Sequence, residues 1–194
     1  MCSSDLEQIN KILDAASAVR MPLVATLAFA GMRAGELQHL LITDVDLESG
    51  WIRIVSRPGV ETKTGESWRV PIHPRLMAIL KVLPRSRGSW FFTAQPSLRH
   101  TDGSNHVNMK HINEDFQKVL VKLGIPAGKK NGGFVLHSLR SSFKTIAINA
   151  GVPREIVDLW QGHKSHRPTA SDGYYAPTDE DHQRFIRLIP FGDG

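Results

Sequence analysis

Six polar side chains, spread over the chain, are of the types that bind a phosphate group and attack it. Two arginines and a lysine could neutralise phosphate oxygens, and two histidines could hydrogen-bond to them or move a proton. A tyrosine hydroxyl could act as the nucleophile. Together these groups would suffice to break a phosphodiester bond of DNA. The positions are Arg33, Lys63, His137, Arg140, His163 and one of the adjacent pair Tyr174 and Tyr175.

Two pairs of these polar residues have helical spacing. Arg33 and Glu36 stand three apart, as do His137 and Arg140, and residues three apart are neighbours on a helix surface. A guanidinium offers paired donors for two phosphate oxygens and keeps its charge throughout a reaction. Glu36 would hold Arg33 in one orientation, and His137 with Arg140 would lie at a helix N-terminus, which favours an anion. Each pair could instead be an ordinary surface or capping pair, worth about 0–1 kcal/mol.

The remaining candidates are less specific when each is taken alone. Lys63 lies in a predicted turn, where exposed lysines are frequent, and His163 follows a glycine at the predicted end of a helix. Tyr174 and Tyr175 are the only tyrosines of the chain and lie between two predicted helices, a position from which a nucleophile could reach in and later release. The alternative is that the aromatic pair packs the C-terminal helix against the core.

The composition is that of one sizeable domain with a basic surplus. The 194 residues suffice to bury a core, and the 24 lysines and arginines exceed the 19 aspartates and glutamates. That surplus fits a polyanionic partner without requiring one. A single cysteine, Cys2, excludes an intrachain disulfide, and no apolar stretch approaches the roughly 20 residues of a membrane helix. The acidic start is unlike a secretory signal, so we expect a cytoplasmic protein without membrane contact.

The hydrophobic periodicity predicts a mainly α-helical domain with one small antiparallel β-sheet near residues 51–72, an α+β fold. Strands are predicted at 51–55, 60–62 and 67–72, with Lys63 in the turn 63–66. Helices are predicted to open at Ser4 and to cover residues 22–29, 33–41, 74–83, 107–123, 137–150, 153–161 and 178–189, the last capped by Thr178 and Asp181.

Matched in order, these segments resemble the tyrosine recombinase (phage integrase) family over residues 5–190. Residues 30–37 with 44–46 are similar to the first signature of that family, and residues 62–65 with 69–72 to its β-hairpin lysine region. The second signature is matched by His137-Ser138-Leu139-Arg140, Gly151-Val152-Pro153, Gly162-His163 and Tyr175-Ala176-Pro177.

The resemblance implies the fold of the family's catalytic domain and a role for each candidate residue. Arg33 and Arg140 would clamp the scissile phosphate, and His163 would donate a further hydrogen bond to a non-bridging oxygen. Lys63 would protonate the departing 5′ oxygen, and His137 would manage the proton of the nucleophile.

For the nucleophile itself the resemblance favours Tyr175, because Tyr-Ala-Pro leading into a capped helix matches the family's segment in register. The gap from His163 to the tyrosines is longer than is usual in the family, and the extra length falls in residues 164–169, which leaves Tyr174 as the alternative. Attack would leave a 3′-phosphotyrosyl enzyme and a free 5′-hydroxyl, with no metal, cofactor or ATP.

The resemblance also implies partners. The chain would be a single catalytic domain (residues 1–194, core 5–190) that starts directly there, without the N-terminal core-binding and arm-binding domains. It would bind double-stranded DNA, act as a tetramer on synapsed DNA, and be a monomer as an isolated domain. Helix 178–189 would dock on a neighbouring protomer through Phe185, Ile186 and Ile189, unless these residues pack within their own chain. Candidate DNA backbone contacts are Arg53, Arg57, Lys110, Lys129, Lys130 and Lys144.

Three other functions remain open from the sequence. A type IB topoisomerase uses the same chemistry but rejoins the same strand, and a catalytically silent relative would only bind DNA. A metalloenzyme would need ligands from the nine histidines, of which His100, His106 and His111 are close in sequence, as are His163 and His166. None of them accompanies an HExxH helix or a cysteine pair, which argues against a metal site.

Overall fold

The computed structural model describes residues 2–84, 88–95, 105–129, 132–163 and 177–192. In these residues it is mainly helical with one antiparallel sheet, which confirms the predicted fold class. The helices are α1 (Cys2–Ala15), α2 (Met21–Ala30), α3 (Ala34–Gln38), the 3₁₀ helix η1 (Ile42–Asp44), α4 (Pro74–Lys81), α5 (Met109–Lys122), α6 (Leu136–Asn149), α7 (Arg154–Trp160) and α8 (Asp179–Ile186). The strands are β1 (Val45–Asp46), β2 (Trp51–Ile54) and β3 (Trp68–Pro71).

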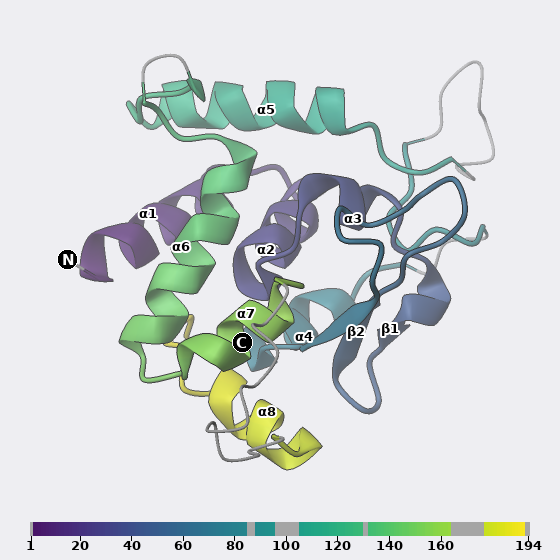
Figure 1. Ribbon diagram of the computed structural model, residues 1–194. Helices are drawn as coiled ribbons and strands as arrows, with labels where there is room; N and C mark the ends of the chain where they lie inside the picture. The colour runs from purple at the N-terminus through teal and green to yellow at the C-terminus, as the bar shows by residue number, and fades with distance from the viewer. Residues whose placement is uncertain (1, 85–87, 96–104, 130–131, 164–176, 193–194) are drawn as a thin grey trace.

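Helix α2 is the centre of the core. Each of its residues from Pro22 to Ala30 is buried, and it packs against α1, α3, α4 and α6. Its one hydroxyl, that of Thr26, donates to the carbonyl oxygen of Pro22 at 2.8 Å, so this buried hydroxyl is paired. Figure 1 shows α2 in the middle of the molecule, with α5 crossing one end and α8 lying at the opposite end beside α7.

The sheet has the order β1-β2-β3, with both neighbouring pairs antiparallel. The predicted strand at residues 60–62 is wrong, because Val60 makes only an isolated bridge to Arg57. A tight turn through Gly59 (φ +81°) closes that bridge, with the Val60 amide donating to the Arg57 carbonyl oxygen at 2.9 Å. The third strand of the sheet is β1 instead. The sequence indicated a turn at these residues, because Asp46 accepts hydrogen bonds from the amides of the tight connection to β2.

Of three predicted helices, two have different bounds in the structure and one has the predicted cap. Helix α1 begins at Cys2, so the predicted cap at Ser4 is wrong. Helix α3 is much shorter than residues 33–41, and Arg33 is its N-cap rather than a helical residue. The predicted cap of α8 is confirmed, because the Thr178 hydroxyl accepts from the Asp181 amide at 3.2 Å and the Asp181 carboxylate accepts from the Thr178 amide at 3.0 Å.

The apolar face of α8 packs within its own chain. Ile186 and Ile189 are fully buried in the core, and Phe185 packs against it, half-buried. In this single chain the residues follow the alternative of packing within the chain, and their use as a contact with a neighbouring protomer stays a prediction. In the described part of the chain, no helix has the length and apolar character needed to cross a membrane.

Candidate active site

Five of the six predicted site residues line one cavity of about 590 Å³. Those five come from four separate places: the N-cap of α3, the turn before β3, the first turns of α6, and the segment just after α7. Tyr174, Tyr175 and the loop 164–169 lie outside the described residues. The cavity is lined by Arg33, Lys63, His137, Arg140, Ser141, Lys144, Thr145, Ile148, Asn149, Arg154, Gln161 and His163.

Arg140 is the most deeply placed of the five, with 4% of its surface exposed. Its Nη1 donates to the Gly31 carbonyl oxygen at 2.6 Å, and its Nη2 to the Gln161 carbonyl oxygen at 2.5 Å. The Gln161 side chain donates back to the Arg140 carbonyl oxygen at 3.0 Å. Burial, and then the nearby charge of Arg33, lower the pKa of Arg140 to about 10, so the guanidinium is still charged at neutral pH. The protein thus holds a rigid cation at the back of the cavity.

His163 is aimed into the cavity by the way α7 ends. Gly162 adopts the left-handed conformation (φ +60°). Its amide donates to the Leu159 carbonyl oxygen at 3.0 Å, and the His163 amide donates to the Asp158 carbonyl oxygen at 2.9 Å. This pair of hydrogen bonds is the Schellman motif, which glycine favours because it lacks a Cβ. The His163 Nε2 then lies 3.3 Å from Arg140 Nη2.

Arg33 is held by Glu36 and by an aromatic ring. Its Nη1 donates to Glu36 Oε1 at 2.6 Å and its backbone amide to Glu36 Oε2 at 2.7 Å. Its guanidinium carbon lies 5.8 Å from the ring centroid of Trp68 in β3. Glu36 therefore orients Arg33 as the sequence predicted, but across a helix start rather than along a helix face.

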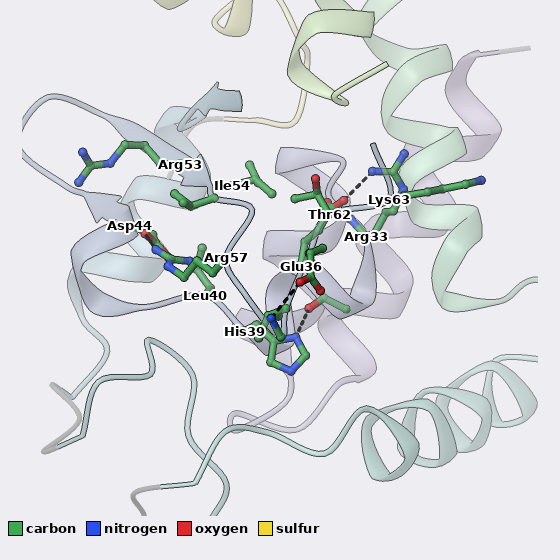
Figure 2. A pocket seen from close by; sticks show the side chains of 15 residues that line it. Arg33, Glu36, His39, Leu40, Asp44, Arg53, Ile54, Arg57, Thr62 and Lys63 are labelled. Atoms are coloured by element: carbon green, nitrogen blue, oxygen red, sulfur yellow. Dashed lines mark hydrogen bonds and ion pairs between the residues drawn. The ribbon is translucent and has the colours of Figure 1, made fainter. Parts of the chain in front are cut away.

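Lys63 lies in the predicted turn, and its side chain is exposed. The turn is closed by the Gly65 amide, which donates to the Thr62 carbonyl oxygen at 3.0 Å, and by the Thr62 hydroxyl, which donates to the Glu66 carbonyl oxygen at 2.7 Å. Lys63 and Arg33 also line a second cavity of about 390 Å³. In Figure 2 they lie together at one end of it, with Arg53 and Asp44 at the other. The two cavities therefore adjoin at these two cations.

His137 lies in the first turn of α6 and is exposed at the mouth of the cavity. Partial desolvation, and then the charges of Arg140, Arg33, Lys129 and Lys63, lower its pKa below the usual value. Its imidazole is therefore mostly neutral at pH 7, in contrast to the cations around it. A neutral imidazole among cations can accept a proton but gains one less readily than a free histidine.

Three residues of this site had no clear signal in the sequence. Trp68 fills the space beside Gly162, where a Cβ would come within 2.4 Å of the indole ring. Gln161 is buried and pairs twice with Arg140. Asp158 accepts a hydrogen bond from His163 Nδ1 at 3.0 Å and forms an ion pair with Lys144. The glycine before His163 was the one local signal for these supporting contacts. Nothing near it in the sequence indicates that Trp68 leaves no room for a Cβ at that position.

Several of the cations predicted to contact DNA already have partners within the chain. Arg57 forms an ion pair with the buried Asp44, and Arg53 donates to the Thr43 carbonyl oxygen at 2.5 Å. Lys144 is paired with Asp158, whereas Lys110 is exposed. Lys130 lies outside the described residues, as do His100 and His166. Across the part of the chain that the structure describes, no group of three or more His, Cys, Asp or Glu residues is placed to hold a metal ion.

Relatives of known sequence share much of this chain. It is 29% identical over 177 residues to a probable integrase/recombinase protein of Methanocaldococcus jannaschii, covering 85% of this chain and 50% of that protein. It is 28% identical over 194 residues to a XerC-like tyrosine recombinase of Caldanaerobacter subterraneus, covering 85% of this chain and 48% of that protein. The chain therefore spans about half the length of these relatives.

Solved structures share the fold. The integrase from mycobacterium phage Brujita matches with a TM-score of 0.69 at 19% identity, over 96% of this chain and 57% of that one. The XerH site-specific recombinase, solved with its difH substrate in a pre-cleavage complex, matches with a TM-score of 0.61 at 18% identity, over 95% of this chain and 48% of that one.

The family profile of the phage integrases matches residues 1–181, nearly the whole chain. With the shared fold and the related sequences, this match shows that the chain belongs to the phage integrase family, the tyrosine recombinases.

Proposed function

We propose that this chain is the catalytic domain of a site-specific DNA recombinase that cuts and rejoins strands through a covalent 3′-phosphotyrosyl intermediate. The observation that carries the proposal is the meeting of Arg33, Lys63, His137, Arg140 and His163 around one cavity. These residues are as many as 130 positions apart in the sequence. A chance surface cluster would not bury one of its arginines and hold it with two carbonyl oxygens.

The cavity suits a phosphate that gains charge during a reaction. Arg140 at the back and Arg33 at the side would bind the non-bridging oxygens of the scissile phosphate. Donors that are oriented before the reaction stabilise the developing charge without reorganising at that moment. Glu36 and Trp68 support this orientation for Arg33, and the carbonyl oxygens of Gly31 and Gln161 support it for Arg140.

Proton transfer in this scheme is divided between Lys63 and His137. The tyrosine oxygen attacks phosphorus, the bond from phosphorus to the 5′ oxygen breaks, and Lys63 gives that oxygen a proton. His137 accepts the proton of the tyrosine hydroxyl, for which its lowered pKa keeps it in the neutral form. The nucleophile we propose is Tyr175, with Tyr174 as the alternative.

The partner we propose is double-stranded DNA, in a tetramer that holds two duplexes. The net charge of +5 and the cations of the cavity are consistent with a polyanion. Among the solved relatives, a lambda integrase dimer is bound to a core site and XerH to its difH substrate.

The test is covalent trapping on the attachment DNA of the element that encodes the protein, with the full-length protein and a nicked substrate that prevents religation. Wild type and Tyr174→Phe should form a protein–DNA adduct, and Tyr175→Phe should not. Loss of the adduct in Tyr174→Phe alone would make Tyr174 the nucleophile. Absence of an adduct with wild type would contradict the proposal and favour a silent DNA-binding relative.

A second assay separates a recombinase from a type IB topoisomerase. Two duplexes of different length that carry the same site are incubated with the protein. A recombinase yields products of new length, because strands are exchanged between duplexes. A protein that only relaxes supercoiled DNA and returns each strand to its own duplex would be a topoisomerase.

A further inference from the structure

Asp158 joins His163 to Lys144, two residues that line the active-site cavity, although it does not line the cavity itself. One of its oxygens, Oδ1, accepts both from His163 Nδ1 at 3.0 Å and from the Lys144 ammonium. Arg154 lies 3.8 Å from the other oxygen. Burial alone would raise the pKa of Asp158, but the hydrogen bonds from Lys144 and His163 outweigh it and lower the pKa. Asp158 is therefore a carboxylate at neutral pH.

These contacts determine which nitrogen of His163 carries the hydrogen. A carboxylate can only accept a hydrogen bond, so the hydrogen of the neutral imidazole is on Nδ1. A guanidinium can only donate, so Nε2 accepts from Arg140 Nη2, 3.3 Å away. In the DNA-free protein, Nε2 is therefore an acceptor that faces the cavity.

This state differs from the one that a bound phosphate requires. For Nε2 to donate to a phosphate oxygen it must gain a proton, and Arg140 Nη2 must turn from Nε2 towards the phosphate. In the described part of the chain, the charged groups lining the cavity with His163 are cations: Arg33, Lys63, Arg140, Lys144 and Arg154. The Asp158 carboxylate on the opposite edge of the ring and the phosphate itself are the anions that would offset the added charge.

We infer that Asp158 is a positioning residue for strand cleavage. It fixes the ring of His163 with Nδ1 protonated, and it offsets the charge that His163 acquires when Nε2 takes up a proton to donate to the phosphate. The first half of the inference, the protonation of Nδ1, rests on geometry alone. The second half, the offset of charge during cleavage, rests on the proposed function. A carboxylate that orients a histidine in this way is a recurring arrangement in catalytic sites.

The first half is tested without activity, by the ¹⁵N chemical shifts of the histidine side chains in the DNA-free protein. The signals of His163 are assigned by their loss in His163→Gln. Wild type should show Nδ1 protonated and Nε2 bare at pH 7.5, and Asp158→Asn should lose this preference. A bare Nδ1 in wild type, or an unchanged pattern in Asp158→Asn, would overturn the inference.

The second half is tested by the rate of adduct formation as a function of pH. Asp158→Asn should slow the reaction at pH 7.5 by about tenfold to a hundredfold, part of what a positioned proton donor contributes. The ratio of this rate to that of wild type should rise as the pH is lowered, because protons are then more available where the carboxylate no longer favours one, and the ratio cancels the protonation of His137 that slows both proteins. Asp158→Glu, which keeps the charge, should restore part of the rate. A rate equal to wild type, or a loss that does not depend on pH, would overturn this half.

The control is Asp115→Asn, on α5. Asp115 also bridges two cations, Arg20 and Lys118, and it lines neither of the two cavities that contain Arg33. It should leave the adduct rate and the His163 signals unchanged, which separates a local effect from a general loss of charge. If wild type forms no adduct at all, the proposed function fails, and the protonation of Nδ1 still decides whether Asp158 positions His163.

Discussion

The two sides of the cavity are built differently. On the inner side, buried hydrogen bonds tie Arg140 to Gly31 at the end of α2 and to Gln161, and His163, itself exposed, is held by Arg140 and by Asp158 of α7. On the outer side, Lys63 and His137 are exposed, each at the edge of a turn or a helix start. The difference suggests two tasks. In the proposed function, the inner side would be assembled before DNA arrives and would bind the phosphate, whereas the outer side would move protons once the phosphate is in place.

The largest effect should come from removing the inner cation. Arg140→Ala should lower the rate of adduct formation about a thousandfold, because a preoriented donor to the reacting phosphate is lost. The substitution lowers stability because the hydrogen bonds to Gly31 and Gln161 are lost, and it raises stability because a buried charge is removed. These effects oppose each other, so the fold should be retained. Circular dichroism and the trapping assay measure the two properties.

Arg140→Lys is the matched variant for that experiment. A single ammonium cannot reach both carbonyl oxygens and the phosphate, so we expect no recovery of the rate. Recovery to near wild type would show that charge alone is needed and that the preassembled inner side is not.

Next in size is the loss of the outer cation. Lys63→Met should leave the free energy of unfolding unchanged within about 0.5 kcal/mol, because the side chain is exposed. It should slow cleavage about a hundredfold if Lys63 protonates the leaving oxygen. A substrate with sulfur at the 5′ bridging position should restore the rate, because a thiolate leaves without a proton. An equal defect on both substrates would show that Lys63 is not the proton donor.

A smaller effect, on stability, distinguishes two glycines that both end helices. Gly162→Ala should cost about 2–3 kcal/mol, since the left-handed backbone disfavours a Cβ and the Cβ would meet the Trp68 ring at 2.4 Å. Gly151→Ala, also at positive φ but with open space around it, should cost only about 1 kcal/mol. Urea denaturation measures both free energies of unfolding. Equal costs would show that contact with Trp68 does not constrain Gly162, and so does not help to place His163.

The smallest effect is on the protonation of His137. Its pKa is lowered in the folded protein, so as the pH falls below about 6.5 the unfolded chain binds the proton first. Its contribution to stability is therefore constant above that pH, declines as the pH falls towards the lowered pKa, and is constant again below it. A bound phosphate should raise the pKa of His137, because the anion offsets the surrounding cations.

His182 serves as the internal reference for that titration. Burial, and then Arg69, lower its pKa too, and it accepts from the indole of Trp160 at 2.9 Å, away from the cavity. Histidine signals followed by NMR should therefore show a rise on DNA binding for His137 and no change for His182. A rise in both would indicate a general electrostatic effect of DNA rather than contact with the phosphate.

Local signals in the sequence predicted much of this site. The start of α6 that carries His137 and Arg140, the glycine before His163 and the capped start of α8 are each determined by a few adjacent residues, and the structure has them where the patterns indicated. The short range of capping and turn hydrogen bonds explains why such features can be read from sequence.

The supporting contacts could not be predicted, because they join distant segments. Trp68 meets Gly162 across 94 positions of sequence, and Lys144 meets Asp158 across 14. The same reason explains the error in the sheet: whether residues 45–46 or 60–62 pair with β2 depends on packing, not on strand propensity. The nucleophile remains a prediction, since both tyrosines lie outside the described residues.

The most direct test of the account is to find the atom of the protein that becomes joined to DNA. The trapped adduct is digested with nuclease and trypsin, and the peptide that contains Tyr174 and Tyr175 is fragmented in a mass spectrometer. We expect a nucleotide attached through its 3′-phosphate to Tyr175. A nucleotide on neither tyrosine, or one attached through a 5′-phosphate, would contradict the claim that the five cavity side chains bind a phosphate that a tyrosine attacks.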